Sequence, residues 1–195
     1  MKLKPMNTAN QLVSLDDQQL LERIAVDKDK LALSELYNRY RHSLGGFLRR
    51  KVYQDKLVDE IYNDVMMAVW QKADSFRGDS KVSTWIFGVA YRVCMSHARK
   101  EMKHTNNRTE IEFDTLEGQL EKEYDSSTSE MIDQLRLATE KLSNNHREVV
   151  ELSYFYGHSM TEISEIMGCP INTVKTRLFH AREKLKSSLN QPNNN

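Results

Sequence analysis

Near the C-terminus, two runs of helical periodicity meet at a Gly-Cys-Pro break, and this break constrains the fold more than any other feature. Ser159 and Glu162 stand three residues apart, which is the spacing of a capping box at the start of a helix. Gly168 suits the left-handed position at which a helix ends, and Pro170 suits the first turn of the next helix. The pattern therefore predicts two helices joined by a sharp turn, as in a helix-turn-helix.

The second of these helices has two contrasting faces. Apolar side chains recur at a spacing of three and four residues and should pack on the preceding helices: Ile171, Val174, Leu178, Ala181 and Leu185. The opposite face combines hydrogen-bond donors, cations and an aromatic ring, as a helix that reads base edges in the major groove requires. We expect the following residues to contact DNA: Asn172, Thr173, Lys175, Thr176, Phe179, His180 and Arg182.

A basic amphipathic helix taken alone is more typical of an ordinary solvated surface. The capping box, the glycine turn and the proline start together favour DNA binding over that alternative. Phe179 favours it further, because a large apolar ring on a polar face is typical of a contact surface.

The rest of the chain is also helical in pattern. Its 195 residues include only 7 Gly and 3 Pro, too few for a fold rich in turns. Val58, Ile61, Val65 and Val69 keep a spacing of three and four, and a similar stripe includes both Trp85 and Ile86. We expect Trp70 and Trp85 to lie in the core. The sequence predicts an all-α protein with two helical domains, at residues 12–103 and 131–188.

Charge is distributed unevenly along the chain. Lys and Arg total 28, and Asp and Glu also total 28, so the chain has no formal net charge. Residues 105–130, however, contain eight acids and two bases, whereas residues 171–186 contain five bases and one acid. Because the acidic segment also lacks apolar periodicity, we interpret residues 104–130 as a flexible acidic linker and residues 189–195 as a disordered tail.

Several classes of protein are excluded. The two cysteines provide no disulfide framework and fit a reducing compartment. The N-terminus lacks the apolar core of a signal peptide, and no apolar run approaches the roughly 20 residues of a membrane helix. These features predict a cytoplasmic protein. Cys94 and His97 have no second pair of metal ligands nearby, so we expect no metal site and no cofactor. Without a nucleophile elbow or a phosphate-binding glycine loop, we expect no enzyme.

Three segments in this order resemble a known family: residues 36–52, residues 58–93 and residues 144–185. From about Asp16 to Leu185, the chain resembles the extracytoplasmic-function (ECF) sigma factors of bacterial RNA polymerase, within the sigma-70 family. The resemblance implies two helical domains, region 2 and region 4, joined by a flexible linker. It implies no enzymatic activity. Its implied partners are core RNA polymerase and promoter DNA, and it leaves open whether an anti-sigma factor controls the protein.

The resemblance also implies a role for particular residues. In region 4, Lys175, Thr176, Phe179 and His180 occupy the positions that read the minus-35 element. In region 2, one helix resembles the element that reads the non-template strand at minus 10 and aids strand opening. Its candidate residues are Arg92, Ser96, His97, Arg99 and Lys100.

The segment of residues 59–64 resembles the part of region 2 that binds the largest polymerase subunit. Its candidate residues are Asp59, Glu60, Asn63 and Asp64. They lie opposite the apolar stripe of the same helix, so we expect a solvent-facing cluster in which charge reversal disturbs no core partner.

Five positions depart from the family pattern. His180, Ser153 and Gly88 stand where relatives often have Arg, Arg92 replaces a common Asn, and Leu57 stands where an Asp is frequent. A second interpretation is a stand-alone helix-turn-helix regulator that does not require polymerase. Such a regulator normally has a sensor or dimerisation domain before its helix-turn-helix, whereas the N-terminal domain of this chain resembles region 2 throughout.

Overall fold

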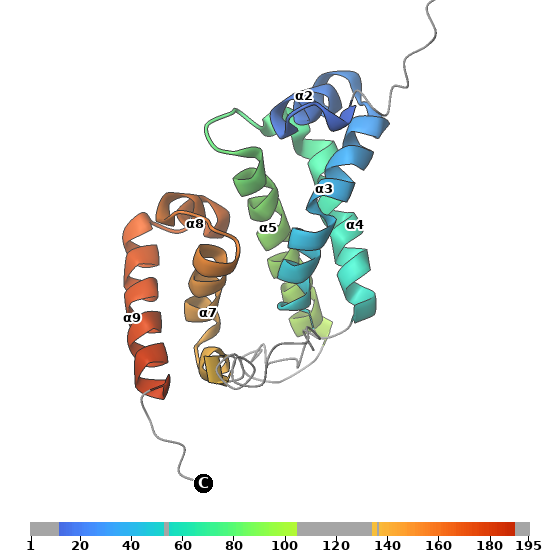
Figure 1. Cartoon of the computed structure of the whole chain (residues 1–195). Coiled ribbons are helices and arrows are strands. Elements are labelled where there is room, and N and C mark those ends of the chain that lie inside the picture. Colours follow the sequence, from blue (N-terminus) through green and yellow to red (C-terminus); the bar gives the residue numbers. More distant parts are fainter. Residues whose placement is uncertain (1–11, 53–54, 105–133, 136, 190–195) are drawn as a thin grey trace, which may run out of the picture. The chain divides into compact units, whose positions relative to one another are not determined.

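The computed structural model describes residues 12–52, 55–104, 134–135 and 137–189. Every regular element in these ranges is helical, which confirms the predicted all-α class. The chain divides into two compact units, Met1–Asn107 and Arg108–Asn195, which Figure 1 colours from blue to green and from yellow to red. Residues 105–130 of the predicted linker and residues 190–195 of the predicted tail lie outside the described residues.

The first unit is a helical bundle. Its elements are α2 (Asp17–Asp27), α3 (Lys30–Arg49), α4 (Asp55–Lys72), the 3₁₀ turn η1 (Ala73–Ser75) and α5 (Val82–His104). Helices α3, α4 and α5 run side by side, and α2 lies across one end of them (Figure 1). The short connections between α2 and α3 and between α4 and α5 keep these helices adjacent.

Side-chain caps fix the boundary between α2 and α3. Asp16 and Gln19 form a capping box at the start of α2, with the Gln19 N–H donating to Asp16 Oδ1 over 2.7 Å. Lys28 ends the helix in the left-handed conformation, with φ of 49°. The next residue, Asp29, then caps α3 by accepting from the N–H groups of Leu31 and Ala32. The turn from α2 into α3 therefore needs only two residues.

The predicted apolar stripes form the core of this unit. Val58, Ile61, Val65 and Val69 are all buried, as expected. The tryptophans are exceptions, because Trp70 and Trp85 are only half-buried, and the expectation that they form core is wrong. Their large rings lie at the edge of the bundle, where Trp85 makes an edge contact with Phe76 and Lys28 lies 6.0 Å from the ring of Trp70.

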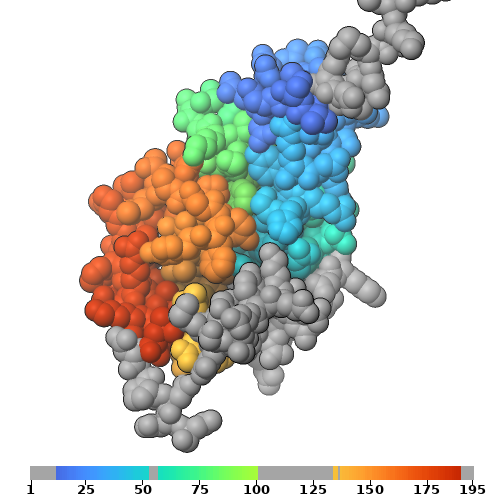
Figure 2. Space-filling view, in the orientation of Figure 1, coloured from blue at the N-terminus to red at the C-terminus, as the bar shows by residue number. Residues whose placement is uncertain are grey.

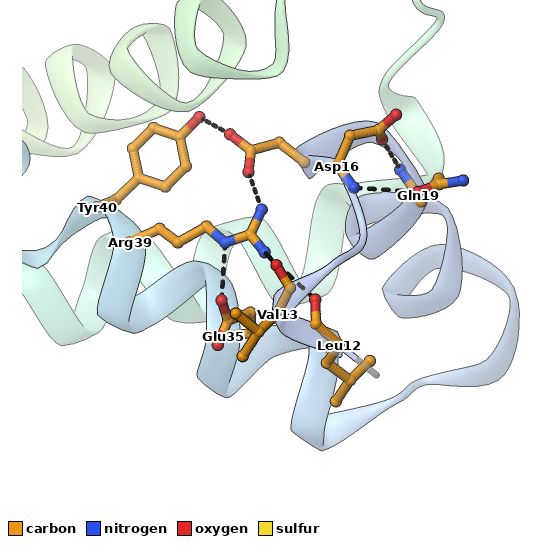
Figure 3. A network of polar contacts seen from close by, with 8 residues as sticks. Leu12, Val13, Asp16, Gln19, Glu35, Arg39 and Tyr40 are labelled. Atoms are coloured by element: carbon orange, nitrogen blue, oxygen red, sulfur yellow. Dashed lines mark hydrogen bonds and ion pairs between the residues drawn. The ribbon is translucent and has the colours of Figure 1, made fainter. Parts of the chain in front are cut away.

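Arg39 of α3 ties the start of the described chain to the bundle (Figure 3). Its guanidinium donates to Asp17, to Glu35 and to the carbonyls of Leu12 and Val13. The hydroxyl of Tyr40 donates to the same Asp17 carboxylate. Burial together with this carboxylate raises the pKa of Tyr40 far above its usual range, so the phenol stays neutral and remains a donor.

The second unit contains α7 (Asn144–Val150), the π-helical segment η2 (Glu151–Phe155), α8 (Met160–Met167) and α9 (Ile171–Leu189). Helices α7 and α9 lie side by side, with α8 across one end (Figure 1). In the space-filling view the atoms of these helices form one continuous surface, coloured orange to red (Figure 2). Its buried residues include Val149, Leu152, Ile163, Ile166 and Leu178.

Two details of this unit differ from the sequence prediction. The sequence pattern indicates only a helix in this part of the chain, whereas the α-helix α7 changes at Glu151 into a π-helix, in which the backbone bonds span five residues. In α9 the apolar stripe is shorter than predicted, because Ile171 is 37% exposed and Leu185 only half-buried. The packed part of α9 is therefore its middle, and its two ends project beyond the core.

Candidate nucleic-acid interface

The geometry of the turn between α8 and α9 follows the sequence pattern. Ser159 and Glu162 form a capping box, in which the Ser159 N–H donates to Glu162 Oε2 over 2.8 Å. Gly168 ends α8 with φ of 63° and ψ of 37°, the left-handed conformation that glycine adopts without strain. Pro170 lies directly before α9, and its carbonyl accepts the N–H of Thr173 over 2.8 Å. The predicted helix-turn-helix is confirmed in its local geometry.

Helix α9 turns its predicted polar face to solvent. Val174, Leu178 and Ala181 are buried and fix the rotation of the helix. Of the candidate DNA-binding residues, Thr173 is half-buried, and six are exposed: Asn172, Lys175, Thr176, Phe179, His180 and Arg182. The ring of Phe179 is 61% exposed, which makes it one of the most exposed large apolar side chains in the described chain.

One aromatic residue of η2, Tyr154, lies close to this face and was not predicted as part of it. Tyr154 and its neighbour Phe155 are 59% and 55% exposed. The hydroxyl of Tyr154 accepts from Arg182 Nε over 2.8 Å, and the guanidinium lies 5.7 Å from the centre of the tyrosine ring. The contact holds Arg182 in one orientation. The run of three aromatics at residues 154–156 was the available signal, but only the fold brings Tyr154 to α9.

A group of basic residues lies between α7 and α9. The rings of His146 and His180 are 6.2 Å apart. Burial lowers the pKa of His146, and the charges of Lys184, His180 and Arg177 lower it further. His146 is therefore neutral at pH 7. The α9 side chains beside it, Arg177, His180 and Lys184, are basic and can contact an anion.

In the first unit, α5 presents most of the candidate minus-10 residues to solvent. Arg92, Ser96, Arg99 and Lys100 are exposed and fall on one face at the helical rotation of about 100° per residue. His97 is half-buried and lies on the flank of this face, toward α4. The exposed set combines three cations with a hydroxyl, a composition suited to a nucleic-acid backbone.

On α4 the predicted acidic face is exposed, but it has neighbours. Asp59, Glu60, Asn63 and Asp64 are all exposed. The Tyr37 hydroxyl donates to Asn63 Oδ1 over 3.4 Å, and Asp64 Oδ2 lies 2.9 Å from His97 Nε2. Charge reversal at Asp64 would therefore disturb its contact with His97 of α5, although neither side chain belongs to the buried core.

Two further observations bear on function. No helix among the described residues is long and apolar enough to cross a membrane. Within the same parts of the chain, no three His, Cys, Asp or Glu side chains are grouped so that they could hold a metal ion. Cys94 is buried, and its neighbour in the C-x-x-H pair, His97, faces Asp64.

Comparisons with known proteins match both units. Residues 36–104 match the family model described as Sigma-70 region 2, and residues 132–185 match the model described as Sigma-70, region 4. The RNA polymerase sigma-H factor of Pseudomonas aeruginosa is 28% identical over 186 residues, which cover 91% of this chain and 96% of that protein. The ECF RNA polymerase sigma-E factor of Haemophilus influenzae is 27% identical over 183 residues, covering 90% of this chain and 96% of the relative.

A solved structure shares the fold. It is the sigma factor RpoE of Bartonella quintana in complex with the anti-sigma factor NepR. The match has a TM-score of 0.60 and 24% sequence identity, and it covers 77% of this chain and 91% of that one.

Proposed function

Because this chain belongs to the sigma-70 family, within its ECF group, we propose that it is an alternative transcription initiation factor that binds core RNA polymerase and directs it to promoters. We propose region 2 at residues 12–103 and region 4 at residues 131–188 as its two functional domains. The protein itself catalyses no reaction, since the polymerase performs the chemistry. Its place of action is the cytoplasm, where polymerase meets DNA.

Each exposed face is assigned one role in this proposal. The outer face of α9 reads the minus-35 element, with Phe179 against a thymine methyl or a sugar and Lys175 donating to guanine or phosphate. The cationic face of α5 holds the non-template strand at minus 10 during strand opening. The acidic face of α4 binds a basic surface of the polymerase.

The observation that carries the proposal is the composition of the first unit. A stand-alone DNA-binding regulator needs no surface that binds polymerase. Here, α4 and α5 of the first unit present an acidic face and a cationic face to solvent. Two surfaces of opposite charge on one bundle fit a protein that holds polymerase and DNA at the same time.

Run-off transcription with purified core polymerase tests this function. We expect the chain to confer initiation at specific start sites, which mapping of the transcripts would locate. If the chain bound DNA but never bound core polymerase, it would act as a stand-alone regulator instead.

We also propose that an anti-sigma factor is a partner of this protein. The sigma factor from Bartonella quintana was solved with such a partner, and its fold is similar to that of this chain. Co-purification of the protein from its native cells, followed by an assay of whether the captured partner blocks polymerase binding, tests this part.

A further inference from the structure

One side-chain contact joins the acidic face of α4 to the minus-10 face of α5. Asp64 Oδ2 and His97 Nε2 are 2.9 Å apart, although the two residues are separated by 33 positions in the sequence. The Asp64 side chain is 53% exposed and that of His97 25% exposed. The carboxylate is therefore open to a partner while it holds the ring.

The contact distinguishes His97 from the rest of the minus-10 set. Within the described parts of the chain, no hydrogen bond or ion pair involves the side chains of the other four members: Arg92, Ser96, Arg99 and Lys100. Those side chains can rotate and lose rotamer entropy when they bind. His97 alone among the five is oriented by another side chain before DNA arrives.

The chemistry of the pair determines which ring nitrogen is left for DNA. An ionised carboxylate only accepts hydrogen bonds, so Nε2 of His97 must be the donor. Because the bond commits one nitrogen of the imidazole, only Nδ1 remains for another partner. Asp64 uses Oδ2 in this bond, and its other oxygen can still accept from a cation of the polymerase.

We propose that Asp64 is a positioning residue for minus-10 recognition, which orients His97 so that Nδ1 is the nitrogen that meets the promoter strand. This inference rests on the proposed function. In this proposal the Asp64 carboxylate has two roles. It is part of the polymerase-binding surface, and it orients the DNA-binding side chain of His97. A change at Asp64 then alters promoter opening even when polymerase binding is complete.

The test uses the full chain with core polymerase at saturating concentration, so that weakened polymerase binding does not limit the result. Opening of the minus-10 element is measured for Asp64→Ala, His97→Ala and the double variant. We expect each single variant to reduce opening by roughly three- to tenfold, the effect of about one hydrogen bond. The double variant should lose no more than either single variant, because the two residues act as one unit.

Asp74→Ala is the matched control, since Asp74 is an exposed carboxylate of η1 without a hydrogen bond or ion pair among the described residues. It should open the promoter like the wild type. Normal opening by Asp64→Ala at saturation would overturn the inference. Losses that multiply in the double variant would do the same.

Nitrogen-15 shifts of the His97 ring in the free protein test the orientation directly. We expect the Nε2-protonated tautomer in the wild type, its loss in Asp64→Ala, and its return in Asp64→Asn, where the amide oxygen can still accept. The same ring signals in all three proteins would overturn the inference. Failure of the wild-type holoenzyme to open any promoter would instead count against the proposed function, because the ring signals do not depend on polymerase.

Discussion

At the scale of single residues, Lys175 offers the sharpest test of the DNA-binding face. It is exposed on the outer face of α9, between the buried Val174 and the exposed Thr176. We predict that Lys175→Ala weakens binding of a minus-35 duplex by about 1–3 kcal/mol if the side chain meets a base. If it meets phosphate instead, the slope of log K against log salt concentration should fall by about one.

Lys141 provides the control for this prediction, since it is an exposed lysine of the same unit that lies outside α9. Lys141→Ala should leave both the affinity and the salt slope unchanged. Transcription assays on promoters with and without an intact minus-35 element distinguish Lys175→Ala from Lys141→Ala further. An equal loss on both promoters would contradict a minus-35 role for Lys175.

His146 gives a prediction about pH. Burial, and then the charges of Lys184, His180 and Arg177, lower its pKa in the folded protein below the usual value near 6.5. The unfolded chain therefore binds a proton that the folded chain does not, so stability is lost as pH falls below about 6.5. In an NMR titration we expect a low midpoint for His146 that rises in Lys184→Gln. Lys186→Gln should not move it, and an unchanged midpoint in Lys184→Gln would contradict the electrostatic cause.

The sequence predicts which side chains of one helix share a face, but it does not predict contacts between residues that lie far apart along the chain. The exposed face of α9 was predicted well, because helical rotation alone determines which side chains share a face. The Asp64–His97 and Arg182–Tyr154 pairs were not predicted. Their partners lie on separate helical segments, and the packing of those segments is not visible in local spacing.

At the scale of elements, Gly168 determines the turn of the helix-turn-helix. Its φ of 63° is unfavourable for most residues with a Cβ, and apart from the adjoining backbone no atom lies within 4 Å of where that Cβ would be placed. We therefore predict that Gly168→Ala destabilises the second unit by about 1–2 kcal/mol through backbone strain alone. Gly168→Asn should cost less, because asparagine tolerates this conformation.

The two units can be followed separately in this experiment. Both tryptophans of the chain, Trp70 and Trp85, belong to the first unit. Tryptophan fluorescence therefore reports the first unit, whereas circular dichroism reports the helices of both. The predicted result is a shift of the dichroism transition with an unchanged tryptophan transition. A cost of Gly168→Asn equal to that of Gly168→Ala would argue against backbone strain as the cause.

Elements with explicit start and stop signals were predicted better than elements without them. The limits of α8 are set by single residues. Ser159 and Glu162 start the helix through a capping box, and Gly168 ends it in the left-handed conformation. The π-helical segment η2 has no such signal, because a change from four-residue to five-residue hydrogen bonds depends on packing around Glu151 and Leu152. The same segment exposes Tyr154, so the unpredicted element also supplied the unpredicted contact of the interface.

At the scale of the whole molecule, the balance of charge is explained by separate surfaces. The chain has equal numbers of acidic and basic residues, yet α9 and α5 present cations to solvent and α4 presents acids. A nucleic-acid binder is usually basic overall. Here, a neutral total is compatible with DNA binding because the acids lie on a different helix from the cations, where they are available to a second partner.

The last prediction tests that acidic face at the level of the complex. Asp59 and Glu60 are exposed on α4, and neither forms a hydrogen bond or ion pair with any described residue. They are better targets than Asp64, whose reversal would also release His97. We predict that Asp59→Lys with Glu60→Lys leaves the fold intact, since exposed substitutions typically cost within about 0.5 kcal/mol each.

Binding of this double variant to core polymerase should fall by roughly tenfold or more, because like charges across a complementary interface cost several kcal/mol. The charge-matched control is Glu22→Lys with Asp27→Lys, which reverses two exposed acids of α2 that likewise have no partner among the described residues. Both double variants change the net charge equally, so a general electrostatic effect would weaken both. A loss confined to the α4 variant, measured by titration of labelled protein with core polymerase, would identify α4 as the polymerase-binding helix. Equal affinities for the two variants would contradict that assignment and leave the outer faces of the remaining helices to be tested in the same way.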